Sequence, residues 1–166
     1  VPGIIRPGIG ALLLGLLGVG YMLTVAPWAT AGDADPVPPF FGNGYMVIFR
    51  LLETESYSDA ADSMLANGPW ILIGILLLWA ILKIVSTSLT LGSGGAGGLF
   101  APALVVGAIV GSLFGLLVVQ TGWFPNVNPA HFALVGMAAM VAATTHAPMT
   151  GVMLVYEIPQ TYSLIV

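Results

Sequence analysis

A long run without charge dominates this sequence, since residues 84–156 contain no Asp, Glu, Lys or Arg. About 20 apolar residues cross the hydrocarbon core of a bilayer as a helix, so this run can hold two or three crossings. Over the whole chain only 6% of residues are charged, whereas a soluble domain carries about a quarter, because its surface must meet water. The sequence therefore predicts an all-α, polytopic integral membrane protein with a single transmembrane region over residues 1–166.

The rest of the composition argues against several classes of function. Three Lys and Arg residues in total cannot form the basic patch that nucleic acid requires. With no Cys there is no disulfide framework, no thiol nucleophile and no thiolate metal site. His131 and His146 have no carboxylate close in sequence, so we expect no metal site and no cofactor, and we expect a protein that is not an enzyme.

Apolar segments and helix-breaking residues predict where the helices lie. Three segments are long enough to cross the membrane and two further apolar helices follow them: residues 7–26, 69–91, 100–120, 130–143 and 148–156. We expect the last helix to carry Glu157 at its end and to stop at Pro159. Residues 27–68, rich in Pro, Gly and acidic side chains, are predicted to form an extramembrane loop that contains two short helices.

Two features of the predicted crossings concern packing. Ala103, Gly107, Gly111 and Gly115 recur every four residues, a ridge of small residues that lets another helix approach closely. Lys83 lies toward the far end of the crossing at residues 69–91. Its stem can snorkel to the interface or its ammonium can meet a carbonyl, and we favour these structural roles over a role in transport.

The stretch GSGGAGG, residues 92–98, is the strongest local signal of function. It leads into a helix that is predicted to begin at Leu99 or Phe100, with Pro102 in its first turn. The first N–H groups of a helix lack intrahelical partners and lie at the positive end of its dipole, so bare backbone before them makes an anion site without a cationic side chain. The alternative is that the glycines only permit close helix crossing. A nucleotide-binding P-loop is excluded, because no Lys follows the last glycine.

The same stretch carries a family resemblance. GSGGAGGLFAP, followed by ALVVGAIVG, resembles the GxFxP filter segment of the CLC family of chloride channels and chloride/proton exchangers, with Gly98, Phe100 and Pro102 in the motif positions. Other stretches agree in order: RPGIGALLLGLLGV, GNGY, LKIVSTSLTLGSGG and GMAAMVAATTHAPMTGVMLVYEIPQTY. The resemblance covers nearly the whole chain.

This resemblance implies a fold, a transported ion and a partner. CLC subunits have two inverted halves, and this chain resembles the second, so we expect the N-terminal half of the same polypeptide to be missing from it. The resemblance assigns chloride to a site formed by Gly98, Leu99, Phe100, Ala101 and Pro102, mainly through backbone N–H groups. It also implies a homodimer in the lipid bilayer through the region from Ala130 to Ile158, although this surface could instead pack within the subunit.

The sequence leaves more than one function possible for this chain. The serine filter loop, gating glutamate and pore tyrosine of the family fall outside this chain, so a chloride channel and a chloride/proton exchanger both fit. A non-conducting membrane scaffold or degenerate subunit with the same fold is the second hypothesis. An intramembrane hydrolase is disfavoured, because Ser93 has no evident His and carboxylate partners. We expect the cell membrane as the location and a hydrogen-bonded structural role for Glu157.

Overall fold

The computed structural model describes residues 5–24, 38–53, 69–121 and 128–162, and the regular elements in these residues are all helices. They are α1 (Ile5–Thr24), α3 (Tyr45–Leu52), α5 (Pro69–Gly92), α6 (Phe100–Gln120), α7 (Pro129–Thr145) and α8 (Pro148–Tyr162). Among the described residues, three stretches are long and apolar enough to cross a membrane: Ile5–Thr24, Leu72–Gly92 and Phe100–Gln120. The predicted all-α membrane fold is confirmed.

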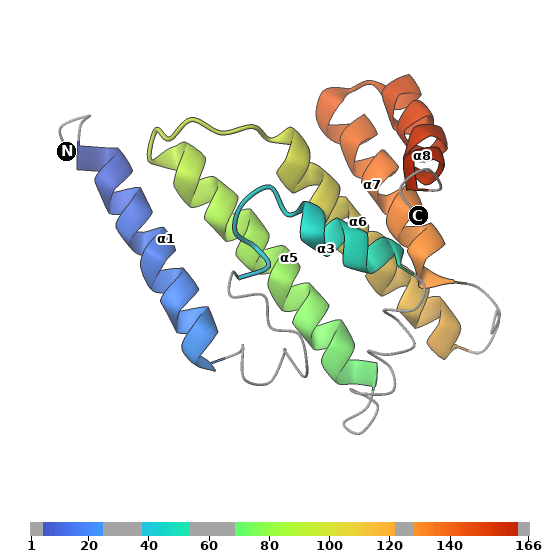
Figure 1. Cartoon of the computed structure of the whole chain (residues 1–166), viewed down its shortest axis with the longest axis horizontal. Coiled ribbons are helices and arrows are strands. Elements are labelled where there is room, and N and C mark those ends of the chain that lie inside the picture. Colours follow the sequence, from blue (N-terminus) through green and yellow to red (C-terminus); the bar gives the residue numbers. More distant parts are fainter. Residues whose placement is uncertain (1–4, 25–37, 54–68, 122–127, 163–166) are drawn as a thin grey trace.

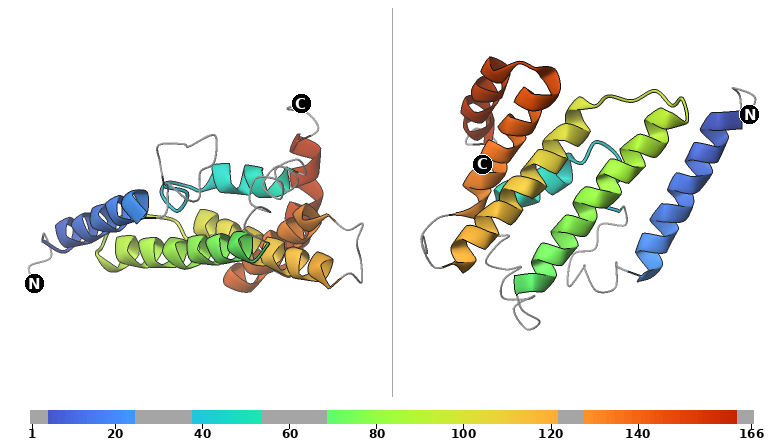
Figure 2. Two further views of the ribbon diagram at one scale, coloured as in Figure 1. Left: turned by 90° about the horizontal axis from the view of Figure 1, so that it is seen from below. Right: turned by 180° about the vertical axis from the view of Figure 1, so that it is seen from behind.

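Four helices lie side by side, and successive members run in opposite directions: α1, α5, α6 and α7 (Figure 1). The short helix α3 crosses one face of this layer, over α6 and α7 (Figure 2). The core lies where α3, α5, α6 and α7 meet, and it includes Val47, Leu76, Val105, Ile109, Met137 and Val141. Helix α6 is therefore the central element, and both its faces are partly covered by protein.

The small-residue ridge of α6 packs against α7, as the sequence predicts. A methyl group built on Gly107 would lie 2.6 Å from the carbonyl oxygen of Gly136. One built on Gly111 would collide with the carbonyl oxygen of Phe132, and one on Gly115 would lie 2.9 Å from the ring of Phe132. These glycines let the two backbones meet, so the packing interpretation of the ridge is confirmed.

The joint between α7 and α8 lies at the predicted interruption. His146 caps the C-terminal end of α7 in the left-handed conformation, with φ 53°, and Pro148 begins α8. The predicted end of the last helix was wrong, because α8 continues through Pro159 to Tyr162 and Glu157 lies inside it. A proline keeps a helical φ, so a helix can continue through it, although the proline donates no backbone hydrogen bond and its ring crowds the carbonyl four residues earlier.

One of the two short helices expected in residues 27–68 is described. This is α3, which places Val47, Ile48 and Leu51 in the core. The second short helix and most of the loop lie outside the described residues. The extramembrane position of residues 27–68 stays a prediction.

Candidate functional site

The glycine run forms an irregular connection between α5 and α6. The N–H of Gly94 donates to the carbonyl oxygen of Leu91, and that of Gly95 to the carbonyl oxygen of Thr90, both at 3.0 Å. Gly94 has φ 89°, and a methyl group on Gly95 would lie 2.8 Å from the Thr90 oxygen. Two of the glycines are thus required by the way the chain leaves α5. Around Gly98, by contrast, a methyl group would meet nothing within 4 Å, so open space borders the backbone there.

Helix α6 begins at Phe100, one of the two predicted starts, and no side chain of the described residues caps it. Its first backbone hydrogen bond runs from the N–H of Ala103 to the carbonyl oxygen of Leu99, at 3.0 Å. The N–H groups of Phe100 and Ala101 come before this series, and Pro102 has no N–H to leave unpaired. The helix therefore presents backbone donors at the positive end of its dipole.

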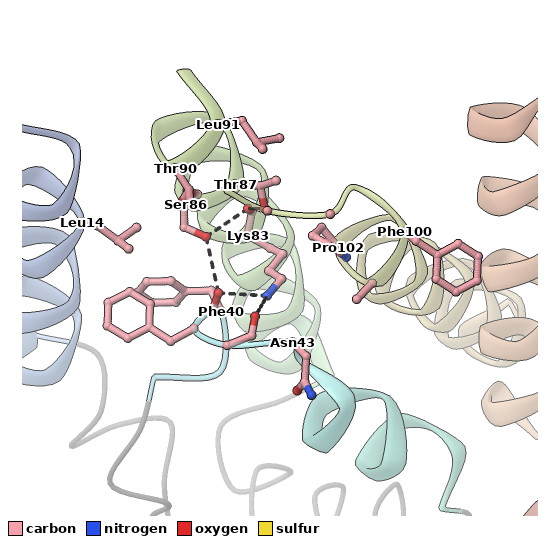
Figure 3. Close-up of a pocket in the computed structure, with 15 residues that line it drawn as sticks. Leu14, Phe40, Asn43, Lys83, Ser86, Thr87, Thr90, Leu91, Phe100 and Pro102 are labelled. Atoms are coloured by element: carbon pink, nitrogen blue, oxygen red, sulfur yellow. Dashed lines mark hydrogen bonds between the residues drawn. The ribbon is translucent and has the colours of Figure 1, made fainter. Parts of the chain in front are cut away.

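The helix start opens on a pocket of about 620 Å³ (Figure 3). Four of the five residues predicted for the site line this pocket, namely Gly98, Phe100, Ala101 and Pro102, whereas Leu99 does not line it. In Figure 3 the ring of Phe100 points away from Lys83, on the far side of the first turn of α6. The structure thus brings most of the predicted residues together around one open space.

Two other segments complete the pocket, and the sequence reasoning assigned neither to the site. One is the turn before α3, which contributes Phe40, Phe41, Gly42 and Asn43. The other is a face of α5, which contributes Lys83, Ser86, Thr87, Thr90 and Leu91. Gly97 and Leu14 complete the lining. In the sequence, the one feature that links these segments to the site is that GNGY, LKIVSTS and GSGG follow one another in this order along the chain. Their convergence in space is a property of the tertiary fold.

Lys83 meets backbone carbonyls, one of the structural roles expected for it. Its side chain is 2% exposed, and Nζ donates to the carbonyl oxygens of Phe40 at 3.1 Å and Gly42 at 2.9 Å. The ammonium therefore turns toward the protein, and its stem does not snorkel to the surface. A buried ammonium requires such partners, because an unpaired charge away from water is costly.

The hydroxyl groups of the pocket donate to backbone carbonyl oxygens: those of Thr87 and Thr90 within α5, and the single proton of Ser86 to acceptors in both α5 and the turn before α3. Thr87 Oγ1 donates to the carbonyl oxygen of Lys83 and Thr90 Oγ1 to that of Ser86, both at 2.8 Å. Ser86 Oγ donates to the carbonyl oxygen of Lys83 at 3.1 Å. With these protons engaged on carbonyl oxygens, the three hydroxyls have no N–H or O–H donor left for an anion.

In the described part of the chain, no arrangement of side chains supports hydrolysis or metal binding. The hydroxyl of Ser93 donates to the carbonyl oxygen of Thr90 at 3.0 Å, an arrangement that holds the turn after α5. Among the described residues, no group of three His, Cys, Asp or Glu side chains is placed to hold a metal ion. The pocket can therefore bind by hydrogen bonding and dipole potential, with polar atoms supplied mainly by the backbone.

Comparison with known proteins identifies the family. A family model described as "Voltage gated chloride channel" matches residues 1–166. The H(+)/Cl(-) exchange transporter ClcA of Vibrio cholerae is 48% identical over 94 residues, which are 55% of this chain and 20% of that protein. The proteins of the same name from Cronobacter sakazakii and Yersinia pestis are 41% and 43% identical over 95 residues, or 56% of this chain and 20% of theirs. The matched segment thus spans about a fifth of the length of these relatives. The match over all 166 residues shows that the chain belongs to the voltage-gated chloride channel (CLC) family of helical integral membrane proteins.

Proposed function

We propose that this chain contributes to the transport of chloride across a membrane, with the first turn of α6 as part of the anion pathway. The observation that carries the proposal is the uncapped start of α6, which opens on the 620 Å³ pocket. Family membership supports chloride as the ion, and the relatives named H(+)/Cl(-) exchange transporters favour exchange with protons over a channel. The cell membrane is the proposed location.

The binding chemistry follows from the donors at the helix start. A chloride ion that enters the pocket loses water and gains hydrogen bonds from the backbone N–H groups of Phe100 and Ala101, assisted by the helix dipole. Gly98 borders this group without a side chain that would block the approach, and Pro102 has no N–H to leave unpaired. Backbone donors hold an anion less tightly than a free cationic side chain, so the ion can also leave, as conduction requires. Lys83 does not supply such a cation freely, because two of its donors are engaged with carbonyls.

We further propose a homodimer that forms through α8, within the expected region from Ala130 to Ile158. Met149, Val152, Met153 and Tyr156 are between 66% and 78% exposed, so α8 carries an apolar surface that a second copy could cover. The alanines of α7 contribute less, because Ala138 and Ala142 pack against Gly151 of the same subunit. Cross-linking between α8 helices in native membranes tests this contact.

The test of transport is chloride efflux from liposomes that contain the complete protein, with a pH electrode in the same chamber. Proton movement coupled to chloride loss indicates an exchanger, and chloride loss alone indicates a channel. If chloride, nitrate and fluoride all stay inside, the non-conducting scaffold replaces our proposal.

Selectivity tests the position of the pathway. Phe100→Ala should change the ratio of nitrate to chloride flux by about fivefold, equivalent to ~1 kcal/mol, because it reshapes the first turn of α6. Phe114→Ala is the matched control, since Phe114 lies on the same helix, is 58% exposed and lies outside the pocket lining. Equal flux ratios in the two variants would remove α6 from the pathway while leaving transport itself established.

A further inference from the structure

A turn of the chain, residues 38–44, forms one wall of the pocket, and we name it the clamp turn. It approaches the rest of the protein closely: Gly44 has φ 76°, and a methyl group there would lie 2.5 Å from Val105 of α6 and 3.4 Å from Nζ of Lys83. Phe40, Phe41, Gly42 and Asn43 line the pocket together with the first turn of α6. The position of the clamp turn therefore sets the width of the space in front of the helix start.

Within the described residues, the backbone–backbone bonds of this turn are local. The N–H of Phe41 donates to the carbonyl oxygen of Pro38 at 2.9 Å, and the N–H of Val47 donates to that of Gly44 at 3.1 Å. Both are local bonds that fix the shape of the turn but not its position against α5. The backbone of the turn is held against α5 by Lys83, whose ammonium uses two of its three N–H donors on the carbonyls of Phe40 and Gly42 (Figure 3).

The ring of Phe40 anchors the same turn from the other side. It is 2% exposed and meets the ring of Tyr21 edge to face, with centroids 5.3 Å apart. Tyr21 in turn accepts a hydrogen bond from Nε1 of Trp79 on α5, at 2.8 Å. Ser86 Oγ adds a longer bond to the Phe40 carbonyl, at 3.4 Å. The ring is held by packing, whereas the backbone that faces the pocket depends on the Lys83 ammonium.

We infer that Lys83 is a positioning residue of the anion pathway, which holds the clamp turn at a fixed distance from the start of α6. This inference rests on the proposed function for its consequence in transport. The inference that Lys83 holds the clamp turn is independent of transport and is based on the hydrogen bonds and burial of Lys83 alone. Without the ammonium, the carbonyl oxygens of Phe40 and Gly42 lose their charged hydrogen-bond donor. The clamp turn is then no longer held against α5 and moves into the pocket. The space before Phe100 and Ala101 then changes shape, although neither of those residues is altered.

Hydrogen–deuterium exchange in the complete protein tests the clamp directly. In Lys83→Met, amides in peptides that cover residues 40–48 should exchange about tenfold faster, the change that ~1.4 kcal/mol produces. Lys83→Arg keeps a charged donor and should restore most of the protection. Thr87→Val is the matched control, because its hydroxyl lies in the same pocket but bonds only to α5. Unchanged exchange in Lys83→Met, or equal exchange in the Met and Arg variants, would overturn the inference.

Transport by the same variants separates positioning from charge. We expect Lys83→Met to alter the nitrate-to-chloride flux ratio and Lys83→Arg to restore it. A changed ratio with unchanged exchange would mean that Lys83 acts through its charge alone, which contradicts positioning. If the wild-type protein moves no anion, the proposed function fails, yet the exchange result still decides whether the clamp exists.

A milder variant covers the case in which Lys83→Met does not fold. Ser86→Ala removes one of the bonds to the Phe40 carbonyl and leaves Lys83 in place. It should raise exchange in residues 40–48 by a smaller factor, about twofold, as expected for a long, neutral hydrogen bond. Exchange equal to that of the wild type would then count against the clamp.

Discussion

Replacing Gly111 by alanine tests how closely α6 and α7 approach. The added methyl group would collide with the carbonyl oxygen of Phe132 and would lie 2.8 Å from its carbonyl carbon and 3.0 Å from Cα of Ala133. These are backbone atoms that cannot rotate away, so the helices must separate. Overpacking of this kind costs about 1–3 kcal/mol, and alanine recovers about 1 kcal/mol of helix propensity. Because the obstruction is backbone, we expect a net loss of about 2 kcal/mol in the free energy of unfolding.

Gly15→Ala provides the matched control. Gly15 is also inside an apolar helix, but a methyl group there meets nothing within 4 Å. Its better helix propensity should stabilise the protein by up to about 1 kcal/mol, which separates the two variants by about 3 kcal/mol. The assay is thermal or denaturant unfolding of the complete protein in mixed micelles. Equal stabilities of the two variants would refute the reasoning, because helix propensity alone would then explain both.

Substitutions at two further positions test the helix ends by the same unfolding assay. His146→Gly should raise the free energy of unfolding by up to about 1 kcal/mol, because glycine adopts a positive φ without strain. His146→Val should lower it, because a β-branched residue is strained there. The reverse order of stability would contradict the left-handed cap. Asn128→Ala should cost about 1 kcal/mol, since Asn128 Oδ1 accepts from the N–H of Ala130 at 3.0 Å at the start of α7. Asn128→Asp keeps that acceptor and should be close to wild type; an Asp variant as unstable as the Ala variant would argue against capping.

Much of the helical architecture could be predicted from the sequence. The start of α6, the packing ridge at Gly107, Gly111 and Gly115, and the interruption at His146 follow from residues that lie close together along the chain. Such features depend on local backbone preference and on side-chain volume. They are encoded wherever glycine, proline and apolar residues recur at helical spacing.

Predictions that depended on distant parts of the chain were less complete. One local prediction is also wrong: the last helix does not stop at Pro159, because the φ of proline fits a helix and α8 continues to Tyr162. A carbonyl partner was foreseen for Lys83, but nothing in the sequence indicated that the partners would be Phe40 and Gly42. The pocket was anticipated only on its α6 side.

The sequence by itself determined that the chain is helical and embedded in a membrane. A backbone in lipid must satisfy its own hydrogen bonds, so long apolar segments without charge can only cross as helices. It also determined an uncapped helix start beside bare glycine backbone. The tertiary structure alone decided that this start faces the clamp turn and a buried ammonium on α5. That arrangement joins three segments that are far apart in the chain, because the packing of α1, α3, α5 and α6 brings the clamp turn within hydrogen-bonding distance of Lys83 and places both beside the start of α6.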